Sequence, residues 1–327
     1  MFSQFALHKH LVTALQDLKF EQPTAVQDEV IPLALEQADL RITAETGSGK
    51  TVAYLLPTLQ QLLGHRFTGT GSRALILVPT RELATQVYTA CRELTLHTNL
   101  RQAVITGGDN FGTQMKLLSL QPELVIATPG RLLKLLEQGS ADFLHLEVLV
   151  LDEADRMLDM GFSENVMAII AQCNANRQSM LLSATLGDKG LRGLAEAVLT
   201  EPEVITLSTV QDKHSAIRHQ VVLADGVEHK LQLLLWLLEH EEYGRAIVFA
   251  NSREQTNKIG GFLVANDRRV GVLPGDKDQA QRKRVMSLLH AKAFDVLVAT
   301  DVAALGLYVD YLGLGINFAL LGHGYCL

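Results

Sequence analysis

The residues best suited to chemistry form one short segment, Ala44 to Thr51, which reads AETGSGKT. It combines a small residue, four spacers and Gly-Lys-Thr, and it lies between an apolar stretch and a helix-like run at Val52–Leu63. Glycines at Gly47 and Gly49 let the backbone curl until successive N–H groups point inward, where the positive end of the following helix also points. This pattern predicts a loop that binds the phosphates of a nucleoside triphosphate. The alternative, an ordinary glycine turn between a strand and a helix, leaves Gly-Lys-Thr at this spacing unexplained.

Two side chains of this segment have distinct predicted roles. Lys50 supplies a positive charge for the β- and γ-phosphates, and the Thr51 hydroxyl is a ligand for Mg²⁺. The predicted nucleotide contacts of the loop are Ala44, Glu45, Thr46, Gly47, Ser48, Gly49, Lys50 and Thr51.

A second chemical element follows the apolar run Val148–Leu151, where the chain continues Asp-Glu-Ala-Asp. Phosphoryl transfer needs a carboxylate near the metal, and Asp152 is predicted to hold Mg²⁺ together with Thr51. Glu153 is predicted to orient and deprotonate the attacking water. The predicted catalytic residues are therefore Lys50, Asp152 and Glu153. Acids at a strand-to-helix junction can also simply stabilise the helix N-terminus, but the phosphate loop upstream favours the catalytic role.

Short apolar segments alternate with helical ones in the first part of the chain. The continuous apolar character of most of these segments is typical of strands buried on both faces of a parallel sheet. The predicted strands are Leu40–Ala44, Ala74–Val78, Gln102–Ile105, Leu124–Ala127, Val148–Leu151, Met180–Ser183 and Val204–Leu207. The predicted helices include Ala25–Leu35, Glu82–Leu96, Leu132–Gln138 and Leu191–Leu199. This order predicts a doubly wound α/β domain whose ligands gather at the carboxyl ends of the strands.

The pattern changes at a polar segment without periodicity, which we interpret as a linker at 209–218 between a first domain, 1–208, and a second, 219–327. A similar alternation follows, which indicates a second α/β unit. Its predicted strands are Val221–Leu223, Ala246–Phe249, Val270–Leu273 and Val296–Ala299, and its predicted helices are Lys230–Glu239, Arg253–Val264 and Gln279–His290.

Composition limits the class of protein. The length of 327 residues fits about two domains. The net charge of −7 excludes a strong global attraction for nucleic acid, so any polyanion site must be a local patch. The three cysteines, Cys91, Cys173 and Cys326, lack metal-ligand spacing and fit buried thiols in a reducing compartment. Because no apolar run reaches about 18 residues and the N-terminus lacks a signal-peptide pattern, we expect a cytoplasmic protein without a membrane partner.

Together these motifs resemble one known family. Asp152-Glu153-Ala154-Asp155 spells the signature of the DEAD-box RNA helicases, and the resemblance extends to about Gly306. The segment FEQPTAVQ resembles the family's Q motif and implies that Phe20 stacks on adenine while the Gln27 amide reads its edge. Lys19 replaces the usual glycine. The resemblance implies two tandem RecA-like, doubly wound parallel-sheet domains that bind ATP and Mg²⁺ and couple hydrolysis to local unwinding of RNA.

Further motifs of the family concern RNA. Pro79–Ala84, Gly107-Gly108 and Thr128–Arg131 resemble its RNA-contacting motifs, and three segments of the second domain do likewise. The resemblance implies sequence-independent backbone contacts from Arg81, Gly108, Thr128, Arg131, Gly275, Arg282 and Thr300. It also implies that Ser183 and Thr185 couple the state of ATP to domain closure. Taken singly, each RNA motif is better explained as a turn that ends a strand, and Ser183-Ala184-Thr185 is explained equally well as a helix cap.

The sequence departs from the family near its end. Leu305 and Tyr308 stand where the family has Arg and Asp, Pro274 stands where a His is usual, and the His-Arg-x-Gly-Arg motif that supplies the arginine fingers is absent. The resemblance therefore implies an incomplete second domain. Since an arginine finger contributes about 10³–10⁵-fold in rate, we expect ATP–Mg²⁺ binding with little turnover. The alternative is a non-catalytic ATP- and RNA-binding fragment.

Overall fold

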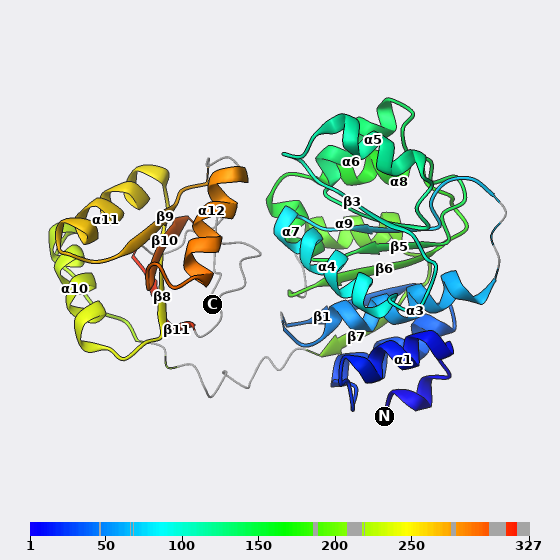
Figure 1. Cartoon of the computed structure of the whole chain (residues 1–327), viewed down its shortest axis with the longest axis horizontal. Coiled ribbons are helices and arrows are strands. Elements are labelled where there is room, and N and C mark those ends of the chain that lie inside the picture. Colours follow the sequence, from blue (N-terminus) through cyan, green and yellow to red (C-terminus); the bar gives the residue numbers. More distant parts are fainter. Residues whose placement is uncertain are drawn as a thin grey trace. The chain divides into compact units, whose positions relative to one another are not determined.

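The fold is taken from a computed structural model of the chain (Figure 1). It describes residues 1–45, 47–65, 67, 69–185, 189–207, 218, 220–275, 279–300 and 312–318. These form two compact units, 1–213 and 214–327, and each is described by itself.

The first unit is built on a seven-stranded parallel sheet with the strand order β3-β4-β2-β5-β6-β1-β7. The strands are β1 (Leu40–Ala44), β2 (Ala74–Leu77), β3 (Gln102–Ile105), β4 (Leu124–Ala127), β5 (Val148–Leu151), β6 (Gln178–Ser183) and β7 (Glu203–Leu207). All seven predicted strands are confirmed, with ends that differ by at most two residues. The carboxyl ends of parallel strands share one edge, so the loops after β1, β5 and β6 are neighbours.

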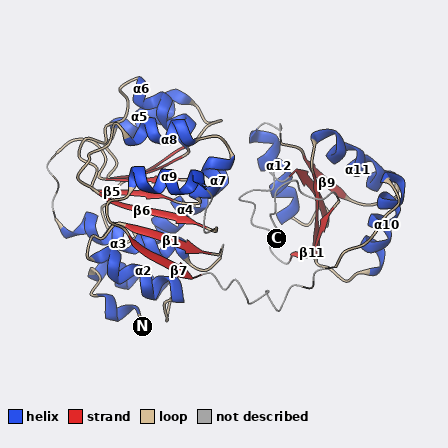
Figure 2. Cartoon of the chain, turned by 180° about the vertical axis from the view of Figure 1, so that it is seen from behind, coloured by secondary structure: helices blue, strands red, loops and turns tan. Residues whose placement is uncertain are grey.

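Helices cover both faces of this sheet (Figure 2). They are α1 (Lys9–Asp17), α2 (Ala25–Leu35), α3 (Lys50–Gly64), α4 (Arg81–Leu94), α5 (Phe111–Ser119), α6 (Pro129–Glu137), α7 (Ala154–Asp159), α8 (Ser163–Ile170) and α9 (Lys189–Val198), preceded by a 3₁₀ helix, Phe2–Phe5. Alternate strand residues enter two different cores: Ala74 and Ile76 pack with α1 to α4, whereas Leu75 and Leu77 pack with α5 to α9. Burial on both faces explains why these strands are continuously apolar.

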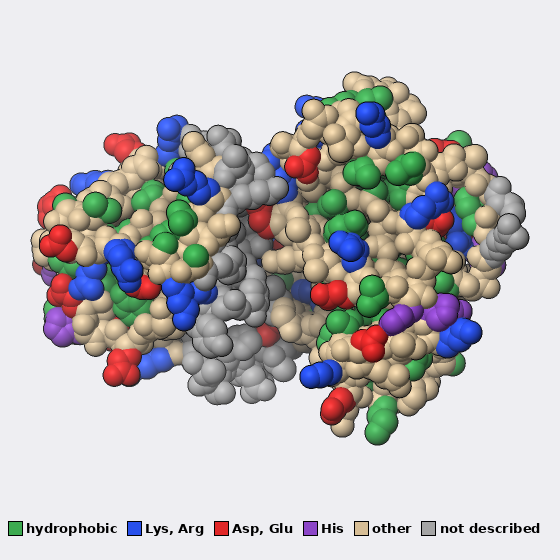
Figure 3. All heavy atoms as spheres, in the orientation of Figure 1, with side chains coloured by type: hydrophobic (Ala, Val, Ile, Leu, Met, Phe, Trp, Pro, Cys, Tyr) green, Lys and Arg blue, Asp and Glu red, His purple; other side chains and the backbone are tan. Residues whose placement is uncertain are grey.

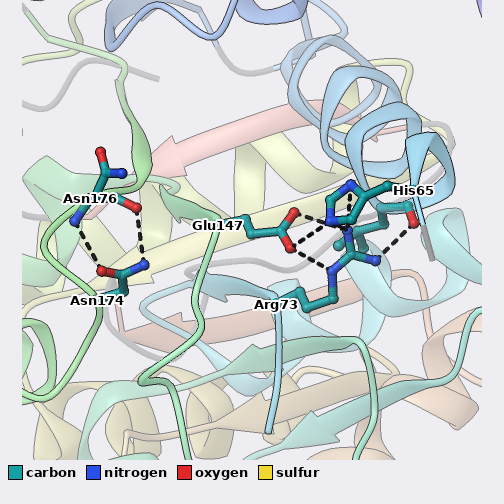
Figure 4. A network of polar contacts seen from close by, with 6 residues as sticks. His65, Arg73, Glu147, Asn174 and Asn176 are labelled. Atoms are coloured by element: carbon teal, nitrogen blue, oxygen red, sulfur yellow. Dashed lines mark hydrogen bonds and ion pairs between the residues drawn. The ribbon is translucent and has the colours of Figure 1, made fainter. Parts of the chain in front are cut away.

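The amino-terminal edge of the sheet contains an ion pair between a buried arginine and a partly buried glutamate (Figure 4). Arg73, directly before β2, donates through Nε and Nη2 to the two carboxylate oxygens of Glu147, directly before β5, at 2.7 and 2.9 Å. Its Nη1 donates to the carbonyl of Leu62 at 2.8 Å, and His65 lies against both charged groups. Nearby, Asn174 and Asn176 exchange two hydrogen bonds that close a turn before β6. This edge lies opposite the one that carries the predicted motifs.

The second unit has a smaller parallel sheet with the strand order β11-β8-β10-β9. Its strands are β8 (Arg245–Ala250), β9 (Val270–Leu273), β10 (Val296–Thr300) and β11 (Leu312–Asn317), and its helices are α10 (Val227–His240), α11 (Arg253–Ala265) and α12 (Gln279–His290). Alternate residues of β8 again enter two cores, one shared with α10 and α11 and one with α12. The prediction of two α/β domains built on parallel sheets is confirmed, and the sheet of the second unit is the smaller one.

Two details of the second unit differ from the prediction. Val221–Leu223 is not a strand: it pairs with no other part of the described chain, and Val221 and Leu223 are 90% and 87% exposed. Conversely, β11 was not predicted, because its sequence, LGLGIN, alternates glycine with apolar residues and lacks the apolar run of a buried strand.

On α10, the single tryptophan, Trp236, is half exposed and its ring stacks on that of His240.

Candidate nucleotide and RNA site

The strands β1 and β5 both border β6, and this arrangement brings the two predicted catalytic segments to one edge of the first sheet. Thr43 lies opposite Ser183 on β6, and Leu151 lies opposite Leu181. The phosphate loop therefore leaves β1, and the acids leave β5, on either side of the end of β6.

The loop after β1 has the backbone that a phosphate site requires. Gly47 and Gly49 have φ of +84° and +96°, a left-handed conformation that side chains rarely adopt. Lys50 begins α3 and is 8% exposed, and its ammonium donates to the carbonyl of Ala44 at 2.5 Å. An ammonium has three donors, so this contact leaves two for a ligand. Thr46 lies outside the described residues.

Gln27 ties the predicted adenine-reading segment to the phosphate loop. Its Nε2 donates to the carbonyl of Gly49 at 3.2 Å, and its Oε1 accepts from the N–H of Thr24 at 2.9 Å as part of a capping box that begins α2. A Cβ at Gly49 would lie 2.6 Å from that Nε2 and would displace the Gln27 amide, in addition to the strain that a side chain meets at this φ. The Gln27 amide keeps one further N–H and one further lone pair. Phe20 is 41% exposed, with its ring 6.3 Å from that of buried Phe2.

Asp152 is buried at 3% exposure, and both of its oxygens accept hydrogen bonds. Oδ1 accepts from the N–H of Glu153 at 2.9 Å, and Oδ2 accepts from the hydroxyl of Tyr54 at 2.9 Å. Burial raises the pKa of the Asp152 carboxyl, while the positive charge of Lys50 and the hydroxyl of Tyr54 oppose that rise. Lys50 and Asp152 thus lie close enough to interact, as a shared phosphate site requires.

The sequence reasoning missed Tyr54, which lies on the second turn of α3 and is fully buried. Burial and the negative charge of Asp152 raise the pKa of Tyr54, and a side-chain hydrogen bond with Thr51 opposes this. The Tyr54 hydroxyl therefore fixes one oxygen of Asp152, a predicted magnesium ligand, from the helix that begins with Lys50. The available signal was a tyrosine one helical turn from Lys50, on a face that must be buried against the sheet.

The donor set fits magnesium rather than a metal held by the protein alone. Within the part of the chain that the structure describes, no group of three or more His, Cys, Asp and Glu side chains is arranged to hold a metal ion. Magnesium typically takes one or two carboxylates together with water and substrate phosphates. Asp152 and Thr51 supply such a partial set of oxygens.

Glu153 has a left-handed backbone conformation, and the pKa of its carboxyl is raised. Its φ of 51° and ψ of 50° place a non-glycine residue in the left-handed region, a strain that is found at functional sites. Burial raises the pKa of the Glu153 carboxyl, the negative charge of Asp152 raises it further, and Arg156 and Lys50 oppose the rise. A raised pKa brings a carboxylate nearer to the basicity that a general base needs.

Asp155 links the loops that follow β5 and β6. Its Oδ2 accepts from the N–H groups of Ala184 and Thr185 at 3.0 and 3.2 Å and from the Thr185 hydroxyl at 3.2 Å. The hydroxyl of Ser183 donates to the carbonyl of Thr185 at 2.6 Å. Asp155 was not among the predicted site residues, yet it joins the acids to the predicted coupling residues.

Three segments predicted to contact RNA meet at the loop 106–110, which follows β3. The Arg81 guanidinium lies against Gly107, where a Cβ would be 2.9 Å from Nη2. The N–H of Thr128 donates to the carbonyl of Ile105 at 3.0 Å. Gly108 is exposed, with a φ of +85°. Arg131 donates to the carbonyl of Asp109 at 3.0 Å.

The second unit shows fewer of the predicted residues. A Cβ at Gly275 would lie 3.2 Å from the Thr300 hydroxyl, so these two are neighbours. Arg282 lies on α12, but its side chain is outside the described set, as are Leu305 and Tyr308. In the visible face of the space-filling view, acidic and basic side chains are interspersed without a large field of one sign (Figure 3).

Comparisons with known proteins give the class of enzyme. The model of the DEAD/DEAH box helicase family matches residues 24–192, and that of the helicase conserved C-terminal domain matches 229–321. The chain belongs to the DEAD/DEAH box helicase family, and ATP-dependent RNA helicase is its enzyme class.

Particular relatives are bacterial. The chain is 39% identical over 320 residues to the ATP-dependent RNA helicase SrmB of Haemophilus influenzae, covering 98% of this chain and 73% of that protein. It is 40% identical over 322 residues to SrmB of Escherichia coli, covering 97% and 72%. It is 39% identical over 312 residues to RhlB of Actinobacillus succinogenes, covering 94% and 75%.

Solved structures confirm the fold. A DEAD box protein from Methanococcus jannaschii is 31% identical, with a TM-score of 0.60, and the match covers 98% of this chain and 85% of that one. Dbp5 of S. cerevisiae, bound to RNA and ADP BeF3, matches with a TM-score of 0.87 at 24% identity, covering 98% and 81%. No helix among the described residues combines the length and apolar character needed to cross a membrane.

Proposed function

We propose that this chain binds ATP and Mg²⁺ at the carboxyl edge of the first sheet and uses them for local unwinding of RNA. The observation that carries this proposal is the Tyr54 hydroxyl, which donates to Asp152 at 2.9 Å and so ties the acid after β5 to α3, the helix that begins with Lys50 of the phosphate loop. The family and its ATP-dependent relatives support the same reaction.

In the proposed site each side chain has one role. Lys50 holds the β- and γ-phosphates, and Thr51 and Asp152 hold Mg²⁺. When bound, Mg²⁺ neutralises charge that develops on the phosphates. Glu153 orients the attacking water and accepts its proton. At the other end of the nucleotide, Gln27 reads the adenine edge and the exposed ring of Phe20 stacks on the base.

The proposed RNA surface of the first unit is the loop 106–110 with its neighbours Arg81 and Thr128, and Arg131 contacts the same loop through the carbonyl of Asp109. Exposed backbone at Gly108 and nearby cations suit a sugar–phosphate chain without reading bases. In the second unit, Gly275, Arg282 and Thr300 are the proposed contacts. Ser183 and Thr185 are the proposed coupling residues, since Asp155 ties their loop to the catalytic acids.

We also propose that the 327-residue chain turns over ATP slowly. The support is in the sequence, where Leu305 and Tyr308 replace the family's Arg and Asp and no His-Arg-x-Gly-Arg motif occurs. Losing an arginine finger raises the barrier by roughly 4–7 kcal/mol, and ground-state contacts at Lys50 do not replace it. The second candidate function, an ATP- and RNA-binding fragment without catalysis, is favoured by the same residues.

One set of measurements tests these proposals. Binding of a fluorescent ATP analogue with Mg²⁺ should be lost in Lys50→Ala and retained in the parent chain. Phosphate release should then be compared without RNA, with single-stranded RNA and with duplex RNA. No binding would refute the nucleotide site, and RNA-stimulated release at the level of SrmB-type relatives would refute slow turnover. An intact mass beyond 327 residues would show that the assayed enzyme is a longer chain.

The cytoplasm is the proposed location. Cys91 and Cys173 are both free, and burial raises the pKa of the Cys91 thiol to about 12, consistent with an inert thiol in a reducing compartment.

A further inference from the structure

The guanidinium of Arg131 is engaged within the protein. Its Nη1 donates to the carbonyl of Asp109 at 3.0 Å and to Oε1 of Gln114 at 2.8 Å, and its Cζ lies 5.4 Å from the centre of the Phe111 ring. Gln114 and Phe111 both belong to α5, and Gln114 is 2% exposed. The Arg131 side chain, from α6, thus contacts both the loop 106–110 and α5, the helix that follows the loop.

Gln114 contacts both Arg131 and the first residue of the loop. Its Nε2 donates to the carbonyl of Thr106 at 2.8 Å, so one buried amide joins the start of the loop to Arg131. Within the loop, the Thr106 hydroxyl donates to Oδ2 of Asp109 at 3.1 Å. At its end, Asn110 caps α5 by accepting from the N–H of Thr113 at 3.0 Å. The loop is therefore held at both ends and in the middle.

We propose that Arg131 is a positioning residue for RNA: it braces the loop 106–110 against α5, and RNA contacts the loop rather than the Arg131 guanidinium. Gln114 and Phe111 are the other parts of the brace. The inference rests on the proposed RNA-binding function and refines the role of one residue in it. Its physical basis is that a planar guanidinium spans two acceptors and an aromatic face at once, which a lysine ammonium does not reproduce.

The two roles of Arg131 predict different salt dependence. A cation that contacts a phosphate of single-stranded RNA contributes about 0.7 to the slope of log affinity against log salt. A brace contributes nothing to that slope, because it acts on the loop and releases no counterion. Lys134, exposed on the same helix, is the matched control for loss of one charge.

The experiment measures affinity of the full chain for fluorescent oligo-U over a range of KCl with a non-hydrolysable ATP analogue. We expect Arg131→Lys, Arg131→Ala and Gln114→Ala each to weaken binding by about tenfold, the cost of re-ordering a backbone residue, with the parent's salt slope. The double variant Arg131→Lys/Gln114→Ala should be no weaker than either single one, since both remove the same brace. Lys134→Ala should change affinity less than twofold.

Hydrogen exchange supplies a readout without RNA. Amides of residues 106–110 should exchange faster in Arg131→Lys and Gln114→Ala and at the parent's rate in Lys134→Ala. A variant that still binds the ATP analogue has a folded first unit. If Arg131→Ala no longer binds the analogue, RNA affinities are compared for Arg131→Lys and Gln114→Ala only.

The inference is overturned if Gln114→Ala and Arg131→Lys bind RNA like the parent chain while Arg131→Ala lowers the slope of log affinity against log salt by about 0.7. Unchanged exchange at 106–110 overturns it too. If the parent chain itself binds no RNA, the proposed function fails and this inference with it, whereas parental binding with the wrong pattern of variants overturns the inference alone.

Discussion

At the scale of single residues, the site depends on side chains that fix the positions of other side chains and of backbone segments. Tyr54, Asp155 and Gln114 each connect segments that are far apart in the sequence, and none was predicted. The reason is physical: their partners lie on other elements, so spacing and periodicity can place such a side chain on a buried face, as for Tyr54, but do not identify its partner. Lys50, Asp152 and Glu153, which the sequence did single out, lie in two segments that the sheet brings to one edge.

The Tyr54 hydroxyl provides a direct test of the nucleotide site. In Tyr54→Phe, Asp152 keeps its bond from the Glu153 N–H but loses the one from Tyr54. A hydrogen bond to a charged group is worth about 1.5–3 kcal/mol, so Mg²⁺–ATP affinity should fall by about 10- to 150-fold, measured by calorimetry. Tyr88→Phe on α4 is the control, and equal affinities in all three proteins would argue against the role of Tyr54.

Glu153→Gln separates binding from chemistry. The amide keeps the size of the side chain but accepts no proton, so we expect nucleotide and RNA binding near the parent level and phosphate release lower by about 10²–10⁴-fold. If the parent rate is already too low, single-turnover quench measurements extend the range. Equal rates would remove Glu153 from its role as base.

The raised pKa of Glu153 also affects stability. In the folded chain its pKa lies above the ordinary value of 4.5, because burial disfavours the carboxylate. Folding therefore favours the proton: this contribution to stability is fully present below the ordinary pKa and is lost as pH rises through the raised one. The free energy of unfolding of the first unit should fall with pH across that window. Glu153→Gln should flatten the profile, and an unchanged slope would contradict burial of the carboxyl as the cause.

At the scale of elements, the strands of the first sheet were predictable because burial on both faces leaves a continuous apolar run. The link between an apolar run and a buried strand failed at two segments of the second unit. Val221–Leu223 is apolar but exposed, and β11 pairs through a glycine-rich sequence. Helices α7 and α8 lie between two predicted strands, β5 and β6, where helical segments were expected, although neither was given bounds. Local sequence predicts elements that are buried, and long-range pairing determines the rest.

The amino-terminal edge of the first sheet gives a prediction about stability. Arg73→Met removes the buried partner of the pair and leaves the partly buried Glu147 without its arginine, which costs about 3 kcal/mol in unfolding free energy, the lower end for a buried pair. Arg101→Met, whose pair with Glu123 is largely exposed, should cost about 0–1 kcal/mol. Chemical denaturation followed by pulse proteolysis of the first unit measures both. Similar costs would show that burial of Arg73 contributes little.

At the scale of the whole molecule, the two compact units carry different spectroscopic signals. The only tryptophan lies on α10 of the second unit, whereas the proposed nucleotide site lies within the first. Without RNA, Mg²⁺–ATP at 100 times its dissociation constant should stabilise the first unit by about 2.7 kcal/mol and leave the tryptophan transition unchanged. Lys50→Ala should remove the shift. A shifted tryptophan transition would mean that nucleotide binding also stabilises the second unit.

The exposed segment Val221–Leu223 has a practical consequence for handling the protein. Three neighbouring aliphatic side chains facing water invite weak self-association, and sulfate strengthens such contacts by its exclusion from protein surfaces. Fractionation by ammonium sulfate should therefore precipitate this chain early, and storage in glycerol at low concentration should keep it dispersed. Replacing Leu223 by lysine would raise the precipitation threshold without touching either sheet.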